Sequence, residues 1–500
     1  MKINLIIKIM NNIPISISRN SDNGIVFTHD QEVAVHGLID FIASSWSDKN
    51  YINALCGAGG VGKTFVTKYV IENCKYSNSV IFCAAPTHKA CRVLSKAIGG
   101  KKVNTIQSLF GFRLDVDIDN FDPNNPAFNP IGKNKMLKDG YAIAKLLIID
   151  EASMLNNKLV NYIAKFCKDK EIKVIFIGDS SQLPPVNESR SQAFVIASKT
   201  YYLREIVRQG ANNPISKLLE LLREDIANKH TWKFLEYINL HKHEVNEVGA
   251  GFTVCGKKDF VNIVSNCFQD EEYTKNIDLY RIIAYTNVRV TAWNDYIRKI
   301  IIKNSDKSII TRHDLIMSYI TIVDDFNDTI INNSEEYIIK DIIDSVEPTY
   351  SFKGFLIKFQ AIHGGDITSP LFVIDHTDAY TCQMYYKQLT TLINDAKAAE
   401  GKSNRASKWK AYFEFKKKYL LATNILNPTT GTIMFGRDID YGFAISSHKS
   451  QGSTYNTVFV DVNDMIYDKN GKPYTNRDEL LRRLYVACSR ASHELILCYG

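Results

Sequence analysis

The 500-residue sequence contains no uninterrupted run of about eighteen apolar residues, the length that a helix needs to cross a bilayer. Its apolar stretch at residues 3–10 is broken by Lys8, and no convincing small-residue cleavage site follows it. The ten cysteines are scattered and form no C-x-x-C pair, which favours reduced core thiols over a disulfide framework or a zinc site. We therefore expect no membrane span, no signal peptide and a reducing compartment such as the cytoplasm.

The sequence also has only a small excess of positive over negative charge. The formal net charge is +7, an excess that permits a polyanionic partner but does not demonstrate one. The sequence shows no internal repeat and no long low-complexity tract. At typical domain sizes, its length predicts about three or four domains or subdomains.

The most informative segment that is present runs from residue 57 to residue 64 and has the pattern G-x-x-x-x-G-K-T of a phosphate-binding P-loop. Residues 52–55 predict a strand before it, and residues 65–71 predict a helix after it, whose N-terminus would face the phosphates. Lys63 would reach the β- and γ-phosphates, and the Thr64 hydroxyl would bind Mg²⁺. A glycine-rich turn without a ligand is the alternative. The predicted nucleotide-binding residues are Gly57, Ala58, Gly59, Gly60, Val61, Gly62, Lys63 and Thr64.

Apolar strands alternate with helices up to about residue 200, which predicts an α/β fold with a parallel sheet between helices. The predicted strands are residues 52–55, 80–84, 146–149 and 173–177. Residues 115–138, rich in Asn, Asp and Pro, interrupt this pattern as an insertion.

A second α/β region begins near residue 201. Its predicted strands are residues 281–284, 443–446 and 457–461. Between residues 305 and 440 it is split by β-rich segments and by two predicted helices, residues 384–400 and 406–421.

Three polar side chains follow predicted strands, at the sheet edge where ligands bind in open α/β sheets. Asp150 would hold Mg²⁺, and Glu151 would polarise the attacking water. Gln182, whose amide both donates and accepts, would sense the γ-phosphate. The alternatives are a helix-capping pair for the acids and an ordinary polar turn around Gln182.

The segments around Lys63, Asp150 and Gln182 resemble motifs I, II and III of superfamily 1 helicases, and the remaining motifs follow in order. The pattern is most similar to the 5′→3′ branch with RecD-type and phage Dda-type enzymes. One departure is Val207, where many relatives carry an aromatic residue that stacks on adenine. The further matching segments are residues 27–31 (Q-motif), 85–90 (Ia), 105–108 (Ib), 203–209 (IV), 284–287 with Asn294 and Arg298, 447–453 (V) and 484–491 (VI).

The resemblance implies two RecA-like P-loop domains with ATP between them. The first would comprise residues 1–110 and 140–200, and the second residues 201–304 and 441–500. Residues 111–139 would carry a strand-separating pin, with Phe121 and Phe128 as candidates, although a plain surface loop is the alternative. Residues 305–440 would form an SH3-like insertion with a helical projection, whose residues 408–419 could instead be an amphipathic docking face.

The resemblance also assigns roles to residues. Gln31 would read the adenine edge, and Gly452 would contact the nucleotide. Arg208 and Arg490 would reach the γ-phosphate from the second domain; the alternative for each is a surface ion pair. The implied catalytic residues are Lys63, Asp150, Glu151, Gln182, Arg208 and Arg490. The implied nucleic-acid contacts, for which local capping or packing is the alternative, are Pro86, Thr87, His88, Thr105, Gln107, Asn287, His448 and Ser453.

The function implied by the resemblance is that of an ATP-dependent DNA helicase, which moves 5′→3′ on single-stranded DNA and unwinds duplex junctions. An ATP-driven clamp or remodeller, a motor subunit of a nuclease complex, and RNA as the substrate are alternatives. We expect a monomer, because both halves of the ATP site lie in one chain. Its partners would be single-strand-binding, replication, repair or recombination proteins. The abundance of Ile, Asn, Lys and Tyr is typical of an AT-rich genome, such as that of a virus or phage, and a viral protein would work in the host cytoplasm or nucleoid.

Overall fold

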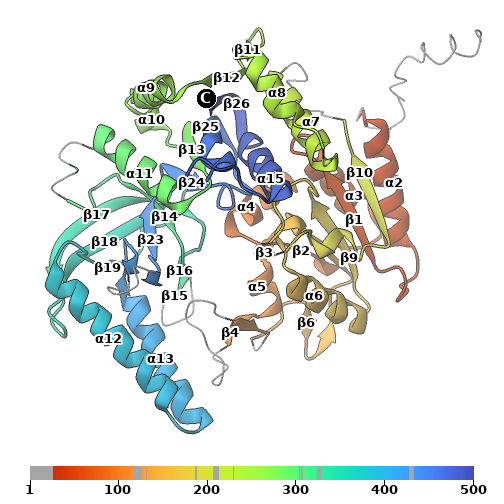
Figure 1. The fold of residues 1–500 in the computed structure, drawn as a ribbon. Coiled ribbons are helices and arrows are strands. Elements are labelled where there is room, and N and C mark those ends of the chain that lie inside the picture. The colour runs from red at the N-terminus through yellow and green to blue at the C-terminus, as the bar shows by residue number, and fades with distance from the viewer. Residues whose placement is uncertain are drawn as a thin grey trace, which may run out of the picture. The chain divides into compact units, whose positions relative to one another are not determined.

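The computed structural model describes residues 26–115, 127–130, 132–185, 188–205, 213–228, 230–302, 305, 308–323, 329–426 and 433–500. The chain forms two compact units (Figure 1). The first comprises Met1–Pro86, Cys91–Asn104 and Met136–Ala211, and the second comprises the rest. None of the helices in the described parts of the chain combines the length and hydropathy of a bilayer-spanning segment.

The first unit is built on a six-stranded sheet in the order β10-β1-β9-β8-β2-β3 (Figure 1). Its β1–β10, β1–β9, β8–β9 and β2–β8 pairs are parallel. The strands are β1 (Ile52–Gly57), β2 (Ile81–Ala85), β3 (Val103–Thr105), β8 (Leu146–Ile149), β9 (Lys173–Gly178) and β10 (Lys199–Leu203). The four predicted strands of this region are therefore confirmed, while the predicted domain boundary at residue 200 falls inside β10.

Helices bury one face of this sheet through a shared apolar cluster. Leu55, Ile148 and Ile177 from the strands pack in it with Leu38 and Val66 from the helices. Both faces of β8 are buried, because all four of its residues are apolar and inaccessible to solvent. The helices of the first unit are α2 (His29–Ala43), α3 (Lys63–Asn73), α6 (Asn157–Asp169) and all but the first turn of α4 (His88–Ala97), whereas α5 (Ile106–Phe110) belongs to the second unit.

The second unit contains a six-stranded sheet in the order β11-β12-β26-β25-β13-β24. All its pairs are parallel except β11–β12. The strands are β11 (His243–Val245), β12 (Gly251–Cys255), β13 (Tyr280–Ala284), β24 (Ala444–Ser446), β25 (Tyr455–Asp461) and β26 (Ala491–Cys498). The three strands predicted for this region are confirmed.

Consecutive strand residues of this sheet alternate between two apolar clusters, which shows that helices cover both faces. Ile283 packs with α7, α8, α14 and α15, whereas its neighbour Ile282 packs with α9, α10 and α11. The helices are α7 (Pro214–Ala227), α8 (Lys233–Leu240), α9 (Lys257–Phe268), α10 (Glu271–Lys275), α11 (Asn287–Ile301), α14 (Val462–Ile466) and α15 (Arg477–Cys488). The predicted fold class, two α/β sheets of the RecA-like kind, is confirmed.

A third sheet, also in the second unit, lies within the predicted insertion and has the order β20-β19-β18-β17-β14-β23. Its pairs are antiparallel except β19–β20. The strands are β14 (Leu315–Ser318), β17 (Glu336–Val346), β18 (Lys353–Ala361), β19 (Leu371–Ile374), β20 (Tyr419–Leu420) and β23 (Ile439–Tyr441). The two predicted helices are confirmed as α12 (Ala379–Ala398) and α13 (Lys402–Lys418).

Four two-stranded hairpins complete the described secondary structure. One, β4 (Arg113–Asp115) with β5 (Ala127–Asn129), belongs to the predicted pin insertion and pairs Leu114 with Phe128. The others are β6 (Leu137–Lys138) with β7 (Tyr141–Ala142), β15 (Ile322–Val323) with β16 (Thr329–Ile331), and β21 (Ile425–Leu426) with β22 (Ile433–Phe435).

Candidate ATP site and nucleic-acid interface

The predicted P-loop connects the end of β1 to the start of α3. Gly60 and Gly62 have φ angles of +84° and +87°, the left-handed region that favours glycine. A Cβ atom at Gly62 would also lie 2.5 Å from Nε2 of Gln31. Glycine is therefore required at residue 62 both for its backbone conformation and for this close approach.

Lys63 holds its ammonium group over the loop. Its Nζ donates to the carbonyl oxygens of Gly57 at 2.7 Å and Ala58 at 2.8 Å. Gly62, the N-cap residue of α3, offers no side-chain acceptor to the first-turn N–H groups. A helix N-terminus beside a lysine can bind phosphate, so the local geometry suits a nucleotide.

Gln31 is almost fully buried and ties α2 to the P-loop. It forms a capping box with Thr28, in which the Thr28 N–H donates to Oε1 of Gln31 at 3.2 Å. Its Nε2 donates to the carbonyl of Val61 at 3.0 Å. Gln31 therefore positions the loop, and its predicted contact with adenine stays a prediction.

Asp150 and Glu151 follow β8, as predicted. Glu151 has a φ of +51°, a left-handed conformation that is uncommon for a residue with a side chain. Its N–H donates to Oδ1 of Asp150 at 2.8 Å. Burial and the charge of Glu151 raise the pKa of Asp150, while the charge of Lys63 lowers it. The positive charge of Lys63 thus acts on Asp150.

The residues fit a hard divalent cation. A pair of adjacent carboxylates and the hydroxyl of Thr64, in the first turn of α3, supply the oxygen ligands that Mg²⁺ prefers. A cation would also relieve the repulsion that raises the pKa of Asp150. Thr64 and Asp150 remain the residues that we expect to hold Mg²⁺.

The turn after β9 forms hydrogen bonds with β1, the strand that precedes the P-loop. The Cys56 thiol donates to Oγ of Ser180 at 3.3 Å, and the Ser180 N–H donates back to the sulfur at 3.4 Å. The Gln182 N–H donates to the carbonyl of Asp179 at 3.1 Å, and the Gln182 side chain is buried. These contacts place Gln182 next to the strand that enters the P-loop, where its sensor role stays a prediction.

In the second unit, Arg490 joins the segments predicted as motifs V and VI. Its Nη1 donates to the carbonyl of Ser453 at 3.1 Å, and its Nε donates to the carbonyl of Val486 at 3.0 Å. Its Nη2 donates to Oγ of Ser489 at 2.7 Å. Gly452, which precedes Ser453, has a φ of +73° and shapes this turn. Arg490 therefore has a structural role in the second unit beside its predicted role at the γ-phosphate.

Two predicted residues, Arg208 and Phe121, lie outside the described residues. Phe128 lies in β5 of the small hairpin. Their predicted roles stay predictions.

Four of the eight predicted nucleic-acid contacts divide into two groups. Thr105 caps α5 by accepting from the Ser108 N–H at 3.2 Å, and Thr87 accepts from the Ala90 N–H at 3.2 Å. Gln107 and Asn287, by contrast, are exposed. The first group has the local capping role that we considered as the alternative, while the second group is accessible to a ligand.

The remaining predicted contacts are less accessible. Pro86 and His88, at the start of α4, are half-buried, and Ser453 is buried. Burial lowers the pKa of His448, which is opposed by the charge of Glu479. The predicted nucleic-acid contact of His448 stays a prediction.

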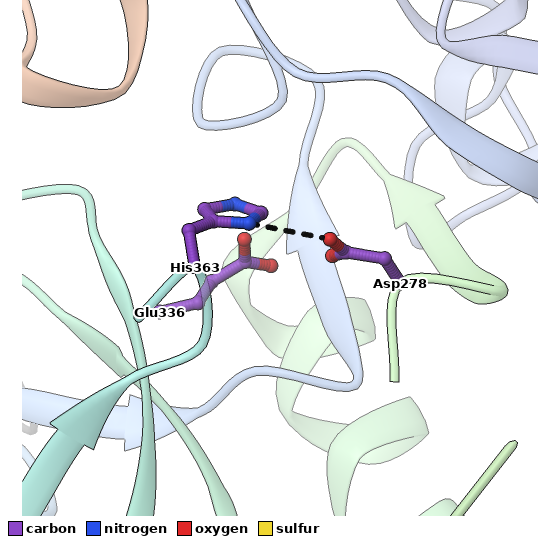
Figure 2. Close-up of side chains that lie close together, drawn as sticks. All are labelled: Asp278, Glu336 and His363. Atoms are coloured by element: carbon purple, nitrogen blue, oxygen red, sulfur yellow. Dashed lines mark ion pairs between the residues drawn. The ribbon is translucent and has the colours of Figure 1, made fainter. Parts of the chain in front are cut away.

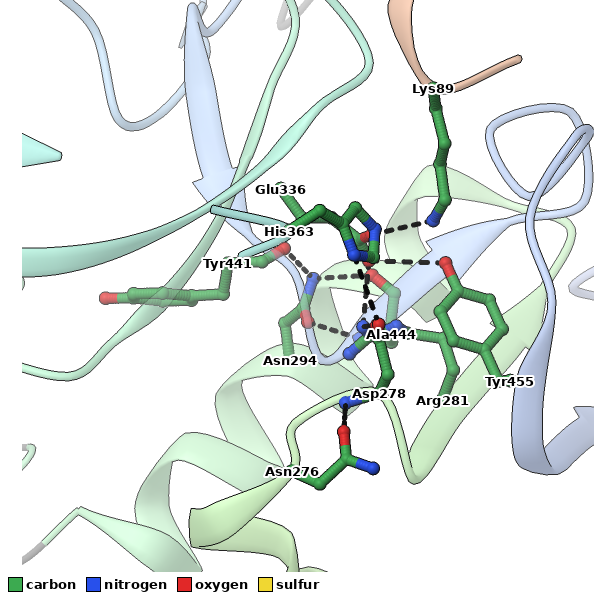
Figure 3. A network of polar contacts seen from close by, with 10 residues as sticks. All are labelled: Lys89, Asn276, Asp278, Arg281, Asn294, Glu336, His363, Tyr441, Ala444 and Tyr455. Carbon is green, nitrogen blue, oxygen red and sulfur yellow. Dashed lines mark hydrogen bonds and ion pairs between the residues drawn. The ribbon is translucent and has the colours of Figure 1, made fainter. Parts of the chain in front are cut away.

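A polar cluster that the sequence did not reveal lies within the second unit, where the residue types could suggest a metal centre (Figure 2). Asp278, Glu336 and His363 place ligand atoms within 4.8 Å of one another. However, Oε1 of Glu336 lies 2.9 Å from Nη2 of Arg281, and Oε2 accepts from Nζ of Lys89 at 3.0 Å (Figure 3). Two cations already neutralise Glu336, so we interpret the cluster as an ion-pair network.

The network connects the second sheet to the third. Arg281 on β13 has no exposed surface, and Glu336 begins β17. Tyr455 on β25 donates to Glu336 at 3.2 Å, and its ring lies 4.6 Å from the Arg281 guanidinium carbon. Although burial opposes it, the charges of Arg281 and Lys89 lower the pKa of Glu336 to about 2. The carboxylate stays charged, and its stabilising contribution is lost only as the pH falls from about 4.5 toward 2.

We expect Glu336→Gln to destabilise the second unit by about 3–5 kcal/mol, because it removes the 2.9 Å partner of buried Arg281 and leaves only the longer 3.6 Å contact with Asp278. Chemical denaturation measures the change. Glu414→Gln is the matched control, since it removes an exposed surface pair with Lys410 at 3.7 Å and should cost less than about 0.5 kcal/mol. A loss below about 1 kcal/mol for Glu336→Gln would contradict this role.

Two protein families match parts of the chain. Residues 39–243 match the AAA domain family, and residues 441–498 match the UvrD-like helicase C-terminal domain family. The first match covers the P-loop and the acids after β8, and the second covers the segment of Ser453 and Arg490.

Curated and solved proteins add further similarities. Uncharacterized protein R530 of Acanthamoeba polyphaga mimivirus is 24% identical over 540 residues, covering 94% of this chain and 99% of that protein. The ATP-dependent DNA helicase dda of Enterobacteria phage T4 is 27% identical over 287 residues, covering 56% of this chain and 58% of that protein. The structure of Pif1 helicase from Bacteroides in complex with ADP-AlF3 and ssDNA covers 94% of this chain and 92% of its own, at 18% identity and a TM-score of 0.47. The chain thus spans nearly all of R530 but little more than half of dda.

Proposed function

Because this chain is a relative of the superfamily 1 helicases of the Dda type, we propose that it is an ATP-dependent DNA helicase that moves 5′→3′ on single-stranded DNA. The observation that carries the proposal is the arrangement of Lys63, Asp150 and Glu151 in the first unit. The P-loop lysine follows β1 and the carboxylate pair follows β8, which is separated from β1 by β9, so both lie at the carboxyl edge of one parallel sheet, the arrangement that phosphoryl transfer requires.

The side chains divide the work of hydrolysis between them. Lys63 would move its ammonium group from the carbonyls of Gly57 and Ala58 to the β- and γ-phosphates of ATP. Thr64 and Asp150 would hold Mg²⁺, which neutralises the charge on the phosphates. Glu151 would orient and polarise the attacking water, and its rigid left-handed backbone helps to fix its position.

Coupling to DNA would involve the second unit. Arg490 would supply positive charge to the γ-phosphate, so that hydrolysis would depend on a residue of the second unit. Exposed Gln107 and Asn287 would bind the DNA backbone, and contacts of that kind carry no sequence information. The match to dda supports a helicase over a clamp, a nuclease-complex subunit or an RNA motor.

The expected partners follow from this function. They are single-stranded DNA, duplex junctions and the single-strand-binding, replication, repair or recombination proteins that act on them. We propose a monomer as the active form, because one chain carries both the P-loop segment and Arg490.

Strand displacement tests both the activity and its direction. With ATP and Mg²⁺, we expect unwinding of a duplex with a 5′ single-stranded tail and not of the same duplex with a 3′ tail; a blunt duplex is the control. Gel separation of the displaced strand gives the measurement. Unwinding of the 3′-tailed duplex alone would support the helicase activity and refute the proposed 5′→3′ direction. ATPase activity stimulated by single strands without unwinding of either duplex would favour a clamp or remodeller.

A further inference from the structure

The two helices inserted after β19 carry most of the net charge of the chain. Residues 379–418, which cover α12 and α13, contain nine basic and three acidic residues, a surplus of six positive charges. The whole chain has a formal net charge of +7. The positive charge is therefore concentrated in this pair of helices, although the net charge of the whole chain is modest.

The structure shows which side chains of α13 belong to the core and which face solvent. The two helices lie side by side (Figure 1), joined by residues 399–401. Trp409, Tyr412 and Phe415 are buried in an apolar cluster with residues of α12. Lys408 and Lys410, on either side of Trp409, are exposed. The apolar side chains of this amphipathic segment thus pack against α12, and the charged side chains of Lys408 and Lys410 lie on its solvent-exposed sides.

The lysines of α13 differ in how they are engaged. Lys416 pairs with buried Asp438 at 2.8 Å, and Lys418 pairs with buried Glu347 at 3.2 Å. Lys410 reaches Glu414 at only 3.7 Å, and both side chains are largely exposed. Such a surface pair contributes little, so Lys410 can exchange it for a stronger anion. Lys408 and Lys410 are therefore available to a ligand, while Lys416 and Lys418 support the fold.

We propose that the exposed lysines on the two flanks of α13, Lys408 and Lys410, bind the phosphate backbone of duplex DNA. This inference rests on the proposed helicase function, in which the duplex still to be unwound lies ahead of the translocating motor. Duplex DNA carries one negative charge per about 1.7 Å of axis, and α13 is a rod about 25 Å long. Backbone contacts would hold the duplex without reading its sequence.

The arrangement of the aromatic side chains favours duplex DNA over single strands. Proteins that bind single strands combine cations with exposed aromatic rings on which the bases stack. In α13, the rings of Trp409, Tyr412 and Phe415 are buried and that of Phe413 is half-buried, so the helix offers exposed cations but no fully exposed ring on which a base could stack. Bases that are already stacked in a duplex need no such platform.

The test compares two double charge reversals. Lys408→Glu/Lys410→Glu changes the proposed surface, and Lys165→Glu/Lys168→Glu on α6 is the control. All four lysines are exposed, and each pair contains one lysine in a 3.7 Å surface ion pair. Fluorescence anisotropy measures the binding of a blunt duplex and of a single strand at several salt concentrations. A separate assay measures the ATPase activity that single strands stimulate.

For Lys408→Glu/Lys410→Glu, we expect about tenfold weaker duplex binding and a salt-dependence slope reduced by about two, because each lost phosphate contact contributes about 0.9 to the slope. Single-strand binding, stimulated ATPase activity and the unfolding temperature should match those of the control. Equal duplex affinities for the two variants would overturn the proposal. An equal loss of affinity for single strands would also overturn it. A selective loss of binding to polyglutamate would overturn it too and would indicate an acidic protein partner. If the wild-type protein binds no DNA, the proposed function itself fails.

Discussion

Lys63→Ala is expected to lower the rate of ATP hydrolysis by at least about 10²–10³-fold while leaving the fold intact. The Lys63 ammonium group already lies over the P-loop, where it donates to two carbonyl oxygens. Removal of one positioned donor to the developing charge costs about this factor in other enzymes. Alanine also removes a positive charge that acts on Asp150, so this carboxylate would repel the phosphates more strongly.

The control for this prediction lies on the same helix. Lys68 in α3 is half-exposed and forms a surface pair with Glu72 at 3.9 Å. Lys68→Ala should therefore retain ATP hydrolysis within about twofold, since exposed pairs contribute little. Steady-state release of phosphate gives the rates, and thermal unfolding confirms that both variants fold. Full activity of Lys63→Ala would refute the P-loop assignment.

Local sequence patterns predicted the elements that depend on local chemistry. The strand β8 is continuous apolar sequence, and its predicted bounds agree with the structure. The P-loop is found because its glycines are needed at fixed positions, as the φ angle of Gly62 shows. Boundaries that depend on the partner strand were less predictable: β10 pairs with β1 of the first sheet, although the predicted boundary divides it after residue 200.

Contacts between distant residues could not be predicted in the same way. Arg281 and Glu336 are 55 positions apart, and neither lies in a recognised motif, so nothing local indicates their ion pair. The only sequence signal was two adjacent acids, Glu335 and Glu336, before an apolar strand. Likewise, Gln31 was expected to face the nucleotide, but its capping bond to Thr28 and its bond to Val61 appear only in the folded chain.

Buried arginines and asparagines illustrate the same limit. Asn294 and Arg298 were part of a helicase signature, which assigns them no chemistry by itself. Asn294 exchanges hydrogen bonds with the backbone of Ala444, and Arg298 pairs with buried Asp314 at 3.0 Å. Both fasten α11 to neighbouring strands. A motif can therefore mark residues that hold the site in place as well as residues that touch a ligand.

Arg490→Ala is expected to preserve ATP binding and to lower DNA-stimulated hydrolysis by about 10³-fold or more, the lower end of the range for an arginine that stabilises phosphoryl transfer in GTPases. The physical reason is the loss of positive charge at the γ-phosphate when the transition state forms. Single-turnover hydrolysis with saturating single-stranded DNA gives the rate, and a fluorescent nucleotide gives the affinity.

The structural role of Arg490 must be separated from this catalytic one. Alanine also removes the bonds to the carbonyls of Ser453 and Val486, which would cost about 1–3 kcal/mol if those groups stay buried and unpaired. A loss that is only structural would lower the unfolding temperature and affect stimulated and basal hydrolysis equally. Arg312→Ala is the control, because Arg312 is exposed and pairs only with Asp341 on the surface.

The variant Arg490→Lys separates the structural role of Arg490 from its catalytic role more clearly. Lysine keeps a positive charge and can donate to one carbonyl, but it lacks the planar fork that spans Ser453 and Val486. We expect this variant to recover most of the stability and little of the stimulated rate, because a flexible ammonium group does not reproduce the position of the guanidinium at the phosphate. If Arg490→Ala instead keeps stimulated hydrolysis within about threefold of wild type, far below the GTPase factors, Arg490 serves only to join its two segments.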